Sequence, residues 1–311
     1  MTRVAVTSHS FSKHPLLRQE VLDRYPGAVF NDTGRPLASA ALVGFLRGRD
    51  RAITGLEVLD AALFGQVPEL RLVSKYGVGL DTIDLDAARA HHVAVRWTPG
   101  VNRQAVAELT LAFMIALRRH LVPLVLDVRG GAWPHFRDGL QLSSATVGVI
   151  GCGHVGQTVA RLCRAFGATV VAHDIRAYPE FYREHDVAPL ALDALLRAAD
   201  IVTLHVPLDA TTRGLIGADQ IAAMPSSAVI VNTARGGVVD EDALHAALVE
   251  GRLAGAALDV FMSEPPGESP LLGLPNVLAT PHVGGGTREA VLLMGRAAIA
   301  GLEPGPETPR P

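Results

Sequence analysis

Short apolar runs alternate with longer stretches of helical character along most of the chain. In the first hundred residues, the runs at 3–8, 28–30, 51–54, 70–76 and 93–95 are typical of strands. The stretches 15–24 and 84–91 have helical character, and the second begins with acidic residues that favour a helix N-terminus. Strands that alternate with helices predict βαβ units and parallel sheets.

The second half of the chain shows the same alternation more strongly. Six apolar runs are short enough to be strands and are separated by helical stretches, at 146–150, 169–174, 200–206, 227–234, 255–260 and 276–281. Six buried strands with helices between them predict a doubly wound sheet.

Residues 98–120, between the two halves, form the clearest predicted helix. Asn102 is a plausible N-cap, and the interior of the stretch is apolar on almost every side, which predicts burial. The next stretch, 121–144, is interrupted by glycine and proline but still carries many apolar residues. A loop and a dimerisation arm fit this stretch equally well.

Composition narrows the range of functions. Of the 311 residues, 49% are hydrophobic and 19% are charged, which is typical of a globular protein. The formal net charge is −3 without a basic stripe, so nucleic acid is not an expected partner. No apolar run reaches about 18 residues, so no membrane span is expected. The two cysteines, Cys152 and Cys163, have no metal-binding or disulfide spacing, so we expect no metal site and a cytoplasmic location.

The strongest chemical signal is the sequence GCGHVG at 151–156. It follows one predicted strand and opens a helical stretch, and a second strand ends at Asp174, 18 residues after Gly156. The dinucleotide-binding fingerprint requires this context. In that fingerprint Gly151 permits the tight turn, Gly153 lets the backbone approach a pyrophosphate, and Gly156 lets helix and strand pack closely. For the motif alone, a glycine-rich structural turn would be an equal alternative.

Asp174 indicates which dinucleotide is bound. Its carboxylate would accept hydrogen bonds from the adenosine ribose and repel a 2′-phosphate, so the sequence predicts NAD rather than NADP. The free N–H groups at the start of the following helix would face the phosphates. Arg176, two positions after Asp174, could weaken the preference for NAD.

Three charged residues follow the last three predicted strands. Arg235 comes after the strand 227–234, Glu264 after 255–260 and His282 after 276–281. Ligands bind at the carboxyl ends of parallel strands, so these side chains are predicted near the dinucleotide. A cation can hold a substrate carboxylate, a histidine can exchange a proton, and a carboxylate behind the histidine can orient it. Each residue alone could be a solvated surface residue, but their joint occurrence favours catalysis.

Together these motifs resemble the D-isomer-specific 2-hydroxyacid dehydrogenase family, which includes phosphoglycerate dehydrogenase and glyoxylate/hydroxypyruvate reductase. The resemblance runs through YGVGLDTIDLDAARAHHVAV, TPGVNRQAVAELT, GCGHVGQTVA, NTARGGVVDEDAL, ALDVFMSEPP and TPHVGG. It implies an α/β fold in which a Rossmann doubly wound cofactor domain is inserted into a flavodoxin-like substrate domain. The substrate domain would comprise residues 1–98 and 286–311. The NAD-binding domain would comprise residues 99–285, with a dimerisation arm at 121–144.

The resemblance also implies an activity and residue roles. The protein would be a homodimer that transfers a hydride between the nicotinamide of NAD and a small 2-hydroxy or 2-keto acid, with or without a phosphonate, phosphate or second carboxylate. Arg235 would bind the substrate, and His282, paired with Glu264, would be the acid in reduction and the base in oxidation. The substrate would also contact Lys75, Tyr76, Gly77, Val78, Gly79 and Asn102. The cofactor would contact Gly151, Gly153, His154, Val155, Gly156, Asp174, His205, Val206, Pro207, Thr212, Thr233, Ala234, Asp259 and Gly285.

Alternatives stay open at the level of sequence. C-terminal binding proteins, which are NAD(H)-sensing protein-binding modules, resemble the same family. A formate-type dehydrogenase is disfavoured, because its histidine is usually paired with glutamine rather than glutamate. Leu56 and Glu57 occupy the stretch where phosphoglycerate dehydrogenase commonly has a phosphate-binding arginine, which argues against 3-phosphoglycerate. Lys75 could contact a second anionic group of the substrate or could be solvated or ion-paired, and the role of the 8–13 loop stays open.

Overall fold

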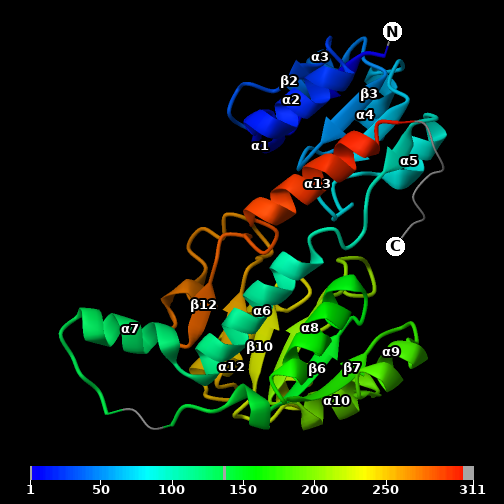
Figure 1. Ribbon diagram of the computed structural model, residues 1–311. Coiled ribbons are helices and arrows are strands. Elements are labelled where there is room, and N and C mark those ends of the chain that lie inside the picture. Colours follow the sequence, from blue (N-terminus) through cyan, green and yellow to red (C-terminus); the bar gives the residue numbers. More distant parts are fainter. Residues whose placement is uncertain (1, 136–137, 304–311) are drawn as a thin grey trace. The chain divides into compact units, whose positions relative to one another are not determined.

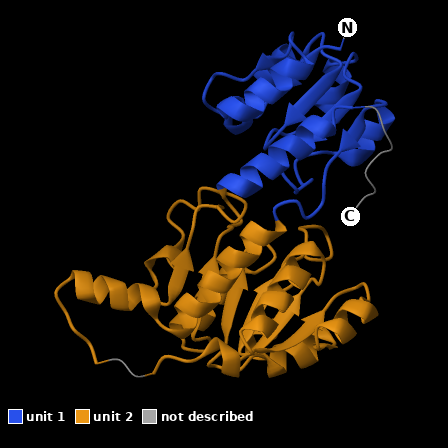
Figure 2. Ribbon diagram, viewed as in Figure 1, with its two compact units in different colours: residues 1–102, 288–311 blue, residues 103–287 orange. Residues whose placement is uncertain are grey.

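The computed structural model describes residues 2–135 and 138–303 (Figure 1). The chain divides into two compact units, Met1–Asn102 with Arg288–Pro311, and Arg103–Thr287 (Figure 2). The first unit is therefore built from both ends of the chain, and the second is inserted into it. Residues 136–137, inside the predicted arm, and the tail 304–311 lie outside the described residues.

The first unit contains a five-stranded parallel sheet in the order β2-β1-β3-β4-β5. This order is the one found in flavodoxin-like folds, which confirms the prediction for this unit. The strands are β1 (Val4–Val6), β2 (Val29–Phe30), β3 (Arg51–Thr54), β4 (Leu72–Lys75) and β5 (Ala94–Arg96). The helices are α1 (His9–Ser12), α2 (Pro15–Arg24), α3 (Ser39–Leu46), α4 (Ala61–Gln66), α5 (Leu85–Ala90) and α13 (Arg288–Ala300).

Apolar side chains cover both faces of this first sheet. Successive side chains of a strand point to opposite faces, so Val4 and Val6 join one buried cluster while Ala5 joins the other. Helix α13 packs against α2 and β4 and brings Ile299 into the cluster of Val4. The far end of the chain thus completes the core of the unit that the first hundred residues begin.

The second unit contains a seven-stranded parallel sheet in the order β12-β11-β10-β9-β6-β7-β8. The strands are β6 (Thr146–Ile150), β7 (Thr169–His173), β8 (Val187–Pro189), β9 (Ile201–Leu204), β10 (Val229–Asn232), β11 (Gly255–Leu258) and β12 (Val277–Ala279). The chain winds outward in one direction from β6 to β8 and in the other from β9 to β12. This arrangement confirms the predicted Rossmann fold, and its switch point lies between β6 and β9, where such sheets bind ligands.

Helices flank this second sheet. They are α6 (Arg103–Arg118), α7 (Leu121–Arg129), α8 (His154–Ala165), α9 (Pro179–Glu184), α10 (Leu192–Ala198), α11 (Ala218–Ala222) and α12 (Glu241–Val249), with short 3₁₀ turns at Leu142–Ser144 and Pro270–Gly273. Helix α6, predicted to be buried, packs on α8, β10 and β11 through residues such as Phe113 and Met114. Its opposite side, at Glu108 and Ala112, is exposed, so the burial is one-sided.

The stretch 121–144 begins as a helix. Helix α7 accommodates Pro123 because a proline in the first turn does not remove a hydrogen bond from the helix interior. None of its residues is buried. The exposed apolar side chains of this stretch are Leu121, Val122, Val125, Leu126, Val128, Trp133 and Leu140. The described residues of the chain therefore leave the apolar surface of α7 open to water.

The described helices are short for a membrane span. No single one is long and apolar enough to cross a bilayer. Helices α6 and α7 reach that length and composition only as a pair, and their axes are bent by 66°.

Candidate active site

The turn between β6 and α8 is built on close backbone approach. Gly151 has φ of +89°, and a Cβ at this position would lie 2.6 Å from the carbonyl oxygen of His205. A Cβ at Gly156 would lie 2.0 Å from the carbonyl oxygen of Gly151. Both contacts are far shorter than any real Cβ contact, so only glycine fits either position. Strand and helix are thereby held at the spacing that the fingerprint requires.

Gly153, the middle glycine of this turn, faces open space instead. No described atom lies within 4 Å of the position of its Cβ. It is the N-cap of α8, no side chain of the described chain caps that end, and the next residues, His154 and Val155, are exposed or partly exposed. The unsatisfied N–H groups and the positive end of the helix dipole suit an anion. The turn therefore fits the pyrophosphate of a dinucleotide.

Asp174 lies directly beside the glycine turn, at the end of β7. One carboxylate oxygen accepts the N–H of Cys152 at 2.6 Å, and the other accepts the N–H of Arg176 at 2.8 Å. Each oxygen keeps a further lone pair that a ribose hydroxyl could use. The neighbouring Cys152 is buried, and burial raises the pKa of its thiol to about 12, so the thiol stays protonated and unreactive.

The segment after β9 carries four of the predicted cofactor residues. His205 shares a hydrogen bond of 3.0 Å with the hydroxyl of Thr203. Thr212 donates its hydroxyl to the carbonyl of Pro207 at 2.6 Å and so folds the segment back on itself. Val206 is partly exposed and Pro207 is exposed. Gly151 touches the backbone of His205, so this segment borders the glycine turn.

The turn that carries Arg235 is fixed by a buried asparagine. Asn232, the last residue of β10, donates to the carbonyl of Arg235 at 2.9 Å and accepts the N–H of Ala234 at 3.0 Å. The guanidinium of Arg235 donates to the carbonyl of Ala234 at 2.7 Å. A Cβ at Gly236 would lie 1.9 Å from the carbonyl oxygen of Phe261, so the backbone of this turn packs closely against the segment after β11.

Thr233 is enclosed, although the sequence analysis placed it in the cofactor site. Its side chain is buried, and its hydroxyl pairs with that of Thr110 on α6 at 2.8 Å. The pair joins β10 to the long helix. Only the backbone of Thr233 and its neighbour Ala234, which is partly exposed, could line a cofactor site.

Glu264 and His282 form a direct pair. Nδ1 of His282 lies 2.7 Å from one oxygen of Glu264, and the other oxygen of Glu264 accepts the N–H of Phe261 at 3.1 Å. Both side chains are exposed, 43% for His282 and 37% for Glu264. With Nδ1 held by the carboxylate, Nε2 is the nitrogen suited to proton exchange.

Asp259 holds the turn that presents His282. It is 1% exposed at the end of β11, and its carboxylate accepts the N–H groups of Val283 at 2.8 Å and Gly284 at 2.7 Å. It also accepts the hydroxyl of Thr280. Asp259 is thus a positioning residue, and its predicted contact with nicotinamide stays a prediction. Gly285, which follows in the same turn, is partly exposed.

The three catalytic candidates come from one edge of one sheet. Strands β10, β11 and β12 are neighbours, and Arg235, Glu264 and His282 each follow one of them. The structure brings Glu264 and His282 into contact, and Gly236 sets the Arg235 turn against the segment that leads to Glu264. Sequence reasoning missed Asn232, whose only signal was a polar residue at the end of an otherwise apolar strand.

The predicted substrate loop lies in the other unit, after β4. The residues from Tyr76 to Gly79 are partly exposed, and Gly77 has φ of +120°. Tyr76 packs edge-on against Phe11, with ring centres 5.3 Å apart, and burial raises the pKa of Tyr76. Asn102 is also partly exposed. Lys75 was expected on the loop, but it is the last residue of β4 and only 5% exposed.

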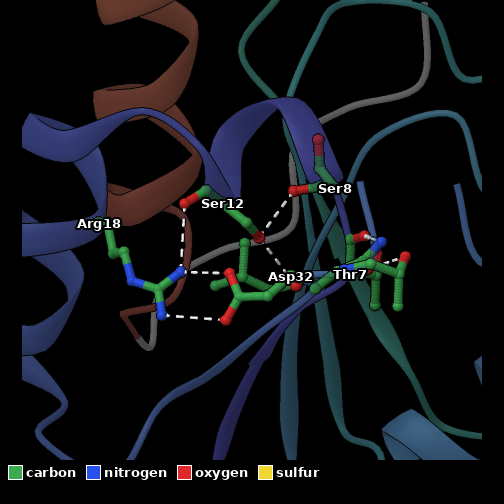
Figure 3. A network of polar contacts seen from close by, with 8 residues as sticks. Thr7, Ser8, Ser12, Arg18 and Asp32 are labelled. Atoms are coloured by element: carbon green, nitrogen blue, oxygen red, sulfur yellow. Dashed lines mark hydrogen bonds and ion pairs between the residues drawn. The ribbon is translucent and has the colours of Figure 1, made fainter. Parts of the chain in front are cut away.

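The 8–13 segment is a short helix rather than a loop (Figure 3). Ser12 donates its hydroxyl to the carbonyl of Ser8 at 2.9 Å, and Arg18 donates to the carbonyl of Ser12 at 3.3 Å. Arg18 also forms two hydrogen bonds with Asp32, at 2.6 and 3.1 Å, and lowers the pKa of that carboxyl. These contacts fix the turn after β1 from within the unit.

The described residues do not form a candidate metal-binding site. Over residues 2–135 and 138–303, no three His, Cys, Asp or Glu side chains are grouped so that they could hold a metal ion.

Known proteins share both the sequence and the fold. Residues 111–284 match the family described as D-isomer specific 2-hydroxyacid dehydrogenase, NAD binding domain. The chain is 42% identical over 224 residues to D-3-phosphoglycerate dehydrogenase of Methanocaldococcus jannaschii. The aligned segment covers 71% of this chain and 43% of that protein. The chain thus spans less than half of that relative's length. It is 36% identical over 310 residues to glyoxylate reductase of Aeropyrum pernix, covering 96% of this chain and 91% of that protein.

One of the similar solved structures contains a bound cofactor and substrate. D-Lactate dehydrogenase of Aquifex aeolicus, complexed with NAD and lactic acid, superposes with a TM-score of 0.85 at 26% identity, covering 96% of this chain and 93% of that chain. The family predicted from the motifs is therefore confirmed. The chain belongs to the D-isomer specific 2-hydroxyacid dehydrogenases, a family of NAD-dependent oxidoreductases.

Proposed function

We propose that the protein transfers a hydride between the nicotinamide of NAD and a small 2-hydroxy or 2-keto acid. The contact of 2.7 Å between His282 and Glu264 carries this proposal. It lies at the sheet edge that also presents Arg235, in the unit with the glycine turn. An oriented imidazole and a guanidinium are the two groups that reduction of a 2-keto acid requires from the protein.

In this proposal NAD is held by the carboxyl ends of β6, β7 and β9. The N-terminus of α8 at Gly153, His154 and Val155 would bind the pyrophosphate, and Asp174 would bind the adenosine ribose. The segments at 205–207 and 233–234 would border the nucleotide. When bound in its reduced form, NAD supplies the hydride.

The remaining chemistry would belong to side chains of this chain. Arg235 would bind the substrate carboxylate and polarise the keto group through charge-assisted hydrogen bonds. His282 would give the proton on Nε2 to the keto oxygen during reduction and take it back during oxidation. Glu264 would stabilise the protonated imidazole. The backbone N–H groups of Val78 and Gly79, on the first unit, would hold the substrate carboxylate.

These assignments give the two units different roles. The unit built from both chain ends would act as the substrate domain, and the inserted unit would act as the cofactor domain. Cys152 and Cys163 are both buried and unpaired, which supports a reducing compartment such as the cytoplasm.

The test is NADH consumption with a panel of 2-keto acids, using the whole chain and both NADH and NADPH. We expect turnover with NADH, and we expect His282→Ala to lower kcat by about 10²–10⁴-fold while NADH affinity changes little. The exposed His92, in the other unit, provides the control variant His92→Asn. Full turnover by His282→Ala would contradict the assigned role. Intact NADH binding without turnover of any acid would favour a protein-binding module instead.

A further inference from the structure

A cavity lies at the amino end of the second sheet. Its volume is about 510 Å³, and it is bordered by the end of α6, the start of α7 and the amino-terminal residues of β10, β11 and β12. Leu140 and Pro275 in its lining are exposed, so the cavity opens to water. Arg235, Glu264 and His282 follow the opposite, carboxyl ends of the same three strands. The size is typical of small-molecule sites, which commonly hold about 300–1,000 Å³.

A buried arginine lines this cavity. Arg118, the last residue of α6, is only 7% exposed. Its guanidinium donates one hydrogen bond to the described part of the chain, from Nη2 to the carbonyl of Gln141 at 3.4 Å, which is long for such a bond. The buried Nε has no acceptor within residues 2–135 and 138–303. The described residues that line the cavity include no Asp or Glu.

A cation in this position needs a counter-ion. Arginine is almost never fully buried unless it is paired, because removing its charge from water is costly. The C-terminal end of α6 provides a partial negative charge beside Arg118, but the described residues provide no acceptor for its Nε. An anion in the cavity would balance the charge of Arg118. The lining thus favours an anionic ligand.

Few other polar side chains line the cavity. Besides Arg118, the polar members of the lining are His120, Ser227 and Asn276. Asn276 donates its amide to the carbonyl of Ala254 at 3.3 Å, and His120 and Ser227 are exposed. A phosphate group carries up to two negative charges and three strong acceptor oxygens, whereas one guanidinium can satisfy a carboxylate through two parallel hydrogen bonds. The lining therefore fits a carboxylate better than a phosphate.

We propose that this cavity binds a small carboxylic acid with a compact apolar body. The carboxylate lies against Arg118, and the body packs on the apolar part of the lining, which includes Leu117, Val229 and Leu278. Burial of the apolar body and the charge-assisted contact with the guanidinium both favour binding. The site is separate from the one that the proposed function gives to the substrate.

The test uses benzoate, with benzamide as its neutral analogue of similar shape. Ligand-observed NMR titrations of the whole chain, without NADH, measure the Kd. Wild type should bind benzoate with a Kd of about 1 mM and benzamide about 10-fold more weakly. Arg118→Met removes the cation and should raise the Kd for benzoate about 10-fold. The matched control is Arg119→Met, at an exposed neighbour outside the lining, which should keep the wild-type Kd.

A second variant separates binding from a structural role of Arg118, which also holds the carbonyl of Gln141. Ala254→Phe leaves Arg118 in place and adds bulk to the lining at an exposed position. We expect it to raise the Kd for benzoate about 10-fold, because the added ring takes the space of the apolar body. The matched control is Ala222→Phe, at an exposed alanine outside the lining. Equal Kd values in the two phenylalanine variants would overturn the inference.

Arg235 is a second place where a carboxylate could bind. Arg235→Ala should leave the Kd for benzoate at the wild-type value. Loss of binding in Arg235→Ala but not in Arg118→Met would place benzoate at the candidate active site and overturn the inference. A wild-type chain that binds no benzoate, or that binds benzamide or inorganic phosphate as tightly, would also overturn it. Because neither NADH nor turnover enters this measurement, failure of the proposed function would leave its result unchanged.

Discussion

His205 shows how burial sets the charge of a single residue next to the glycine turn. Burial lowers the pKa of His205 to about 3, so the imidazole is neutral in the folded protein at neutral pH. Its Nε2 can therefore share a hydrogen bond with the hydroxyl of Thr203 as either donor or acceptor. The residue thus supports the cofactor segment without taking part in proton transfer.

The low pKa of His205 predicts that acid destabilises the fold. An unfolded histidine has a pKa of about 6.5, so between pH 6.5 and 3 the unfolded state binds the extra proton. The free energy of unfolding should fall as the pH drops through this window, by up to ~1.4 kcal/mol per pH unit from this group. His205→Gln keeps a partner for Thr203 and removes the titration. Urea unfolding from pH 7 to pH 4 should show the advantage of wild type shrinking as the pH falls. A difference that does not depend on pH would contradict the assignment, and His92→Asn is the control.

At the scale of elements, strand β6, the glycine turn and helix α8 pack so closely that a single added methyl group would force them apart. A Cβ at Gly156 would overlap the carbonyl of Gly151, which is backbone and cannot rotate away. Helix α8 would have to move from β6, and its N-terminus would move with it. Phosphate binding at that terminus depends on the direction of its N–H groups.

Gly156→Ala should therefore weaken both the fold and the binding of NADH. Overpacking of this kind costs about 1–3 kcal/mol, so we expect the Kd for NADH to rise by roughly 10-fold or more. The control is Gly273→Ala, because no described atom lies within 4 Å of that Cβ position. Fluorescence titration with NADH measures both variants. Wild-type affinity in Gly156→Ala would show that the helix does not need this contact.

Elements could be predicted from sequence where burial requires a long apolar run. The other six strands of the second sheet, apart from β8, follow such runs, because parallel strands are commonly covered on both faces. The sequence does not indicate strand β8, because only Val187 of its three residues is buried and the strand ends in Pro189. The sequence favours neither loop nor arm at helix α7, because Gly130, Gly131 and Pro134 interrupt the pattern of this stretch.

The candidate site could be predicted only in part for a similar reason. Arg235, Glu264 and His282 could be found because each follows a strand, and strand ends of a parallel sheet meet at one edge. Their supporting contacts join distant positions that no spacing reveals. Lys75 and Gly55 are 20 residues apart, and Asp259 and Gly284 are 25 apart. The sequence suggests which residues react, but the fold decides which residues position them.

At the scale of the whole molecule, the exposed surface of α7 requires an explanation. Leu121, Val122, Val125, Leu126 and Val128 are 41–60% exposed on one short helix. Monomeric proteins rarely expose large contiguous apolar patches, and such patches commonly mark contacts with another chain. Together with the resemblance of 121–144 to a dimerisation arm, this favours a homodimer with α7 at its interface. A two-fold axis would place the same patch on both copies.

A homodimer with α7 at its interface would lose half of its mass when α7 becomes charged. Wild type should elute as a dimer in size-exclusion chromatography with light scattering at micromolar concentration. The double variant Val122→Glu/Leu126→Glu should elute as a monomer, because burying unpaired carboxylates at an interface is unfavourable. Its NADH affinity should stay close to that of wild type, since α7 is remote from the glycine turn in sequence and packs on α6. Val249→Glu, at a 61% exposed residue of α12, is the matched control and should stay dimeric. A wild-type monomer, or a dimer that survives both substitutions, would assign the apolar surface of α7 to another partner.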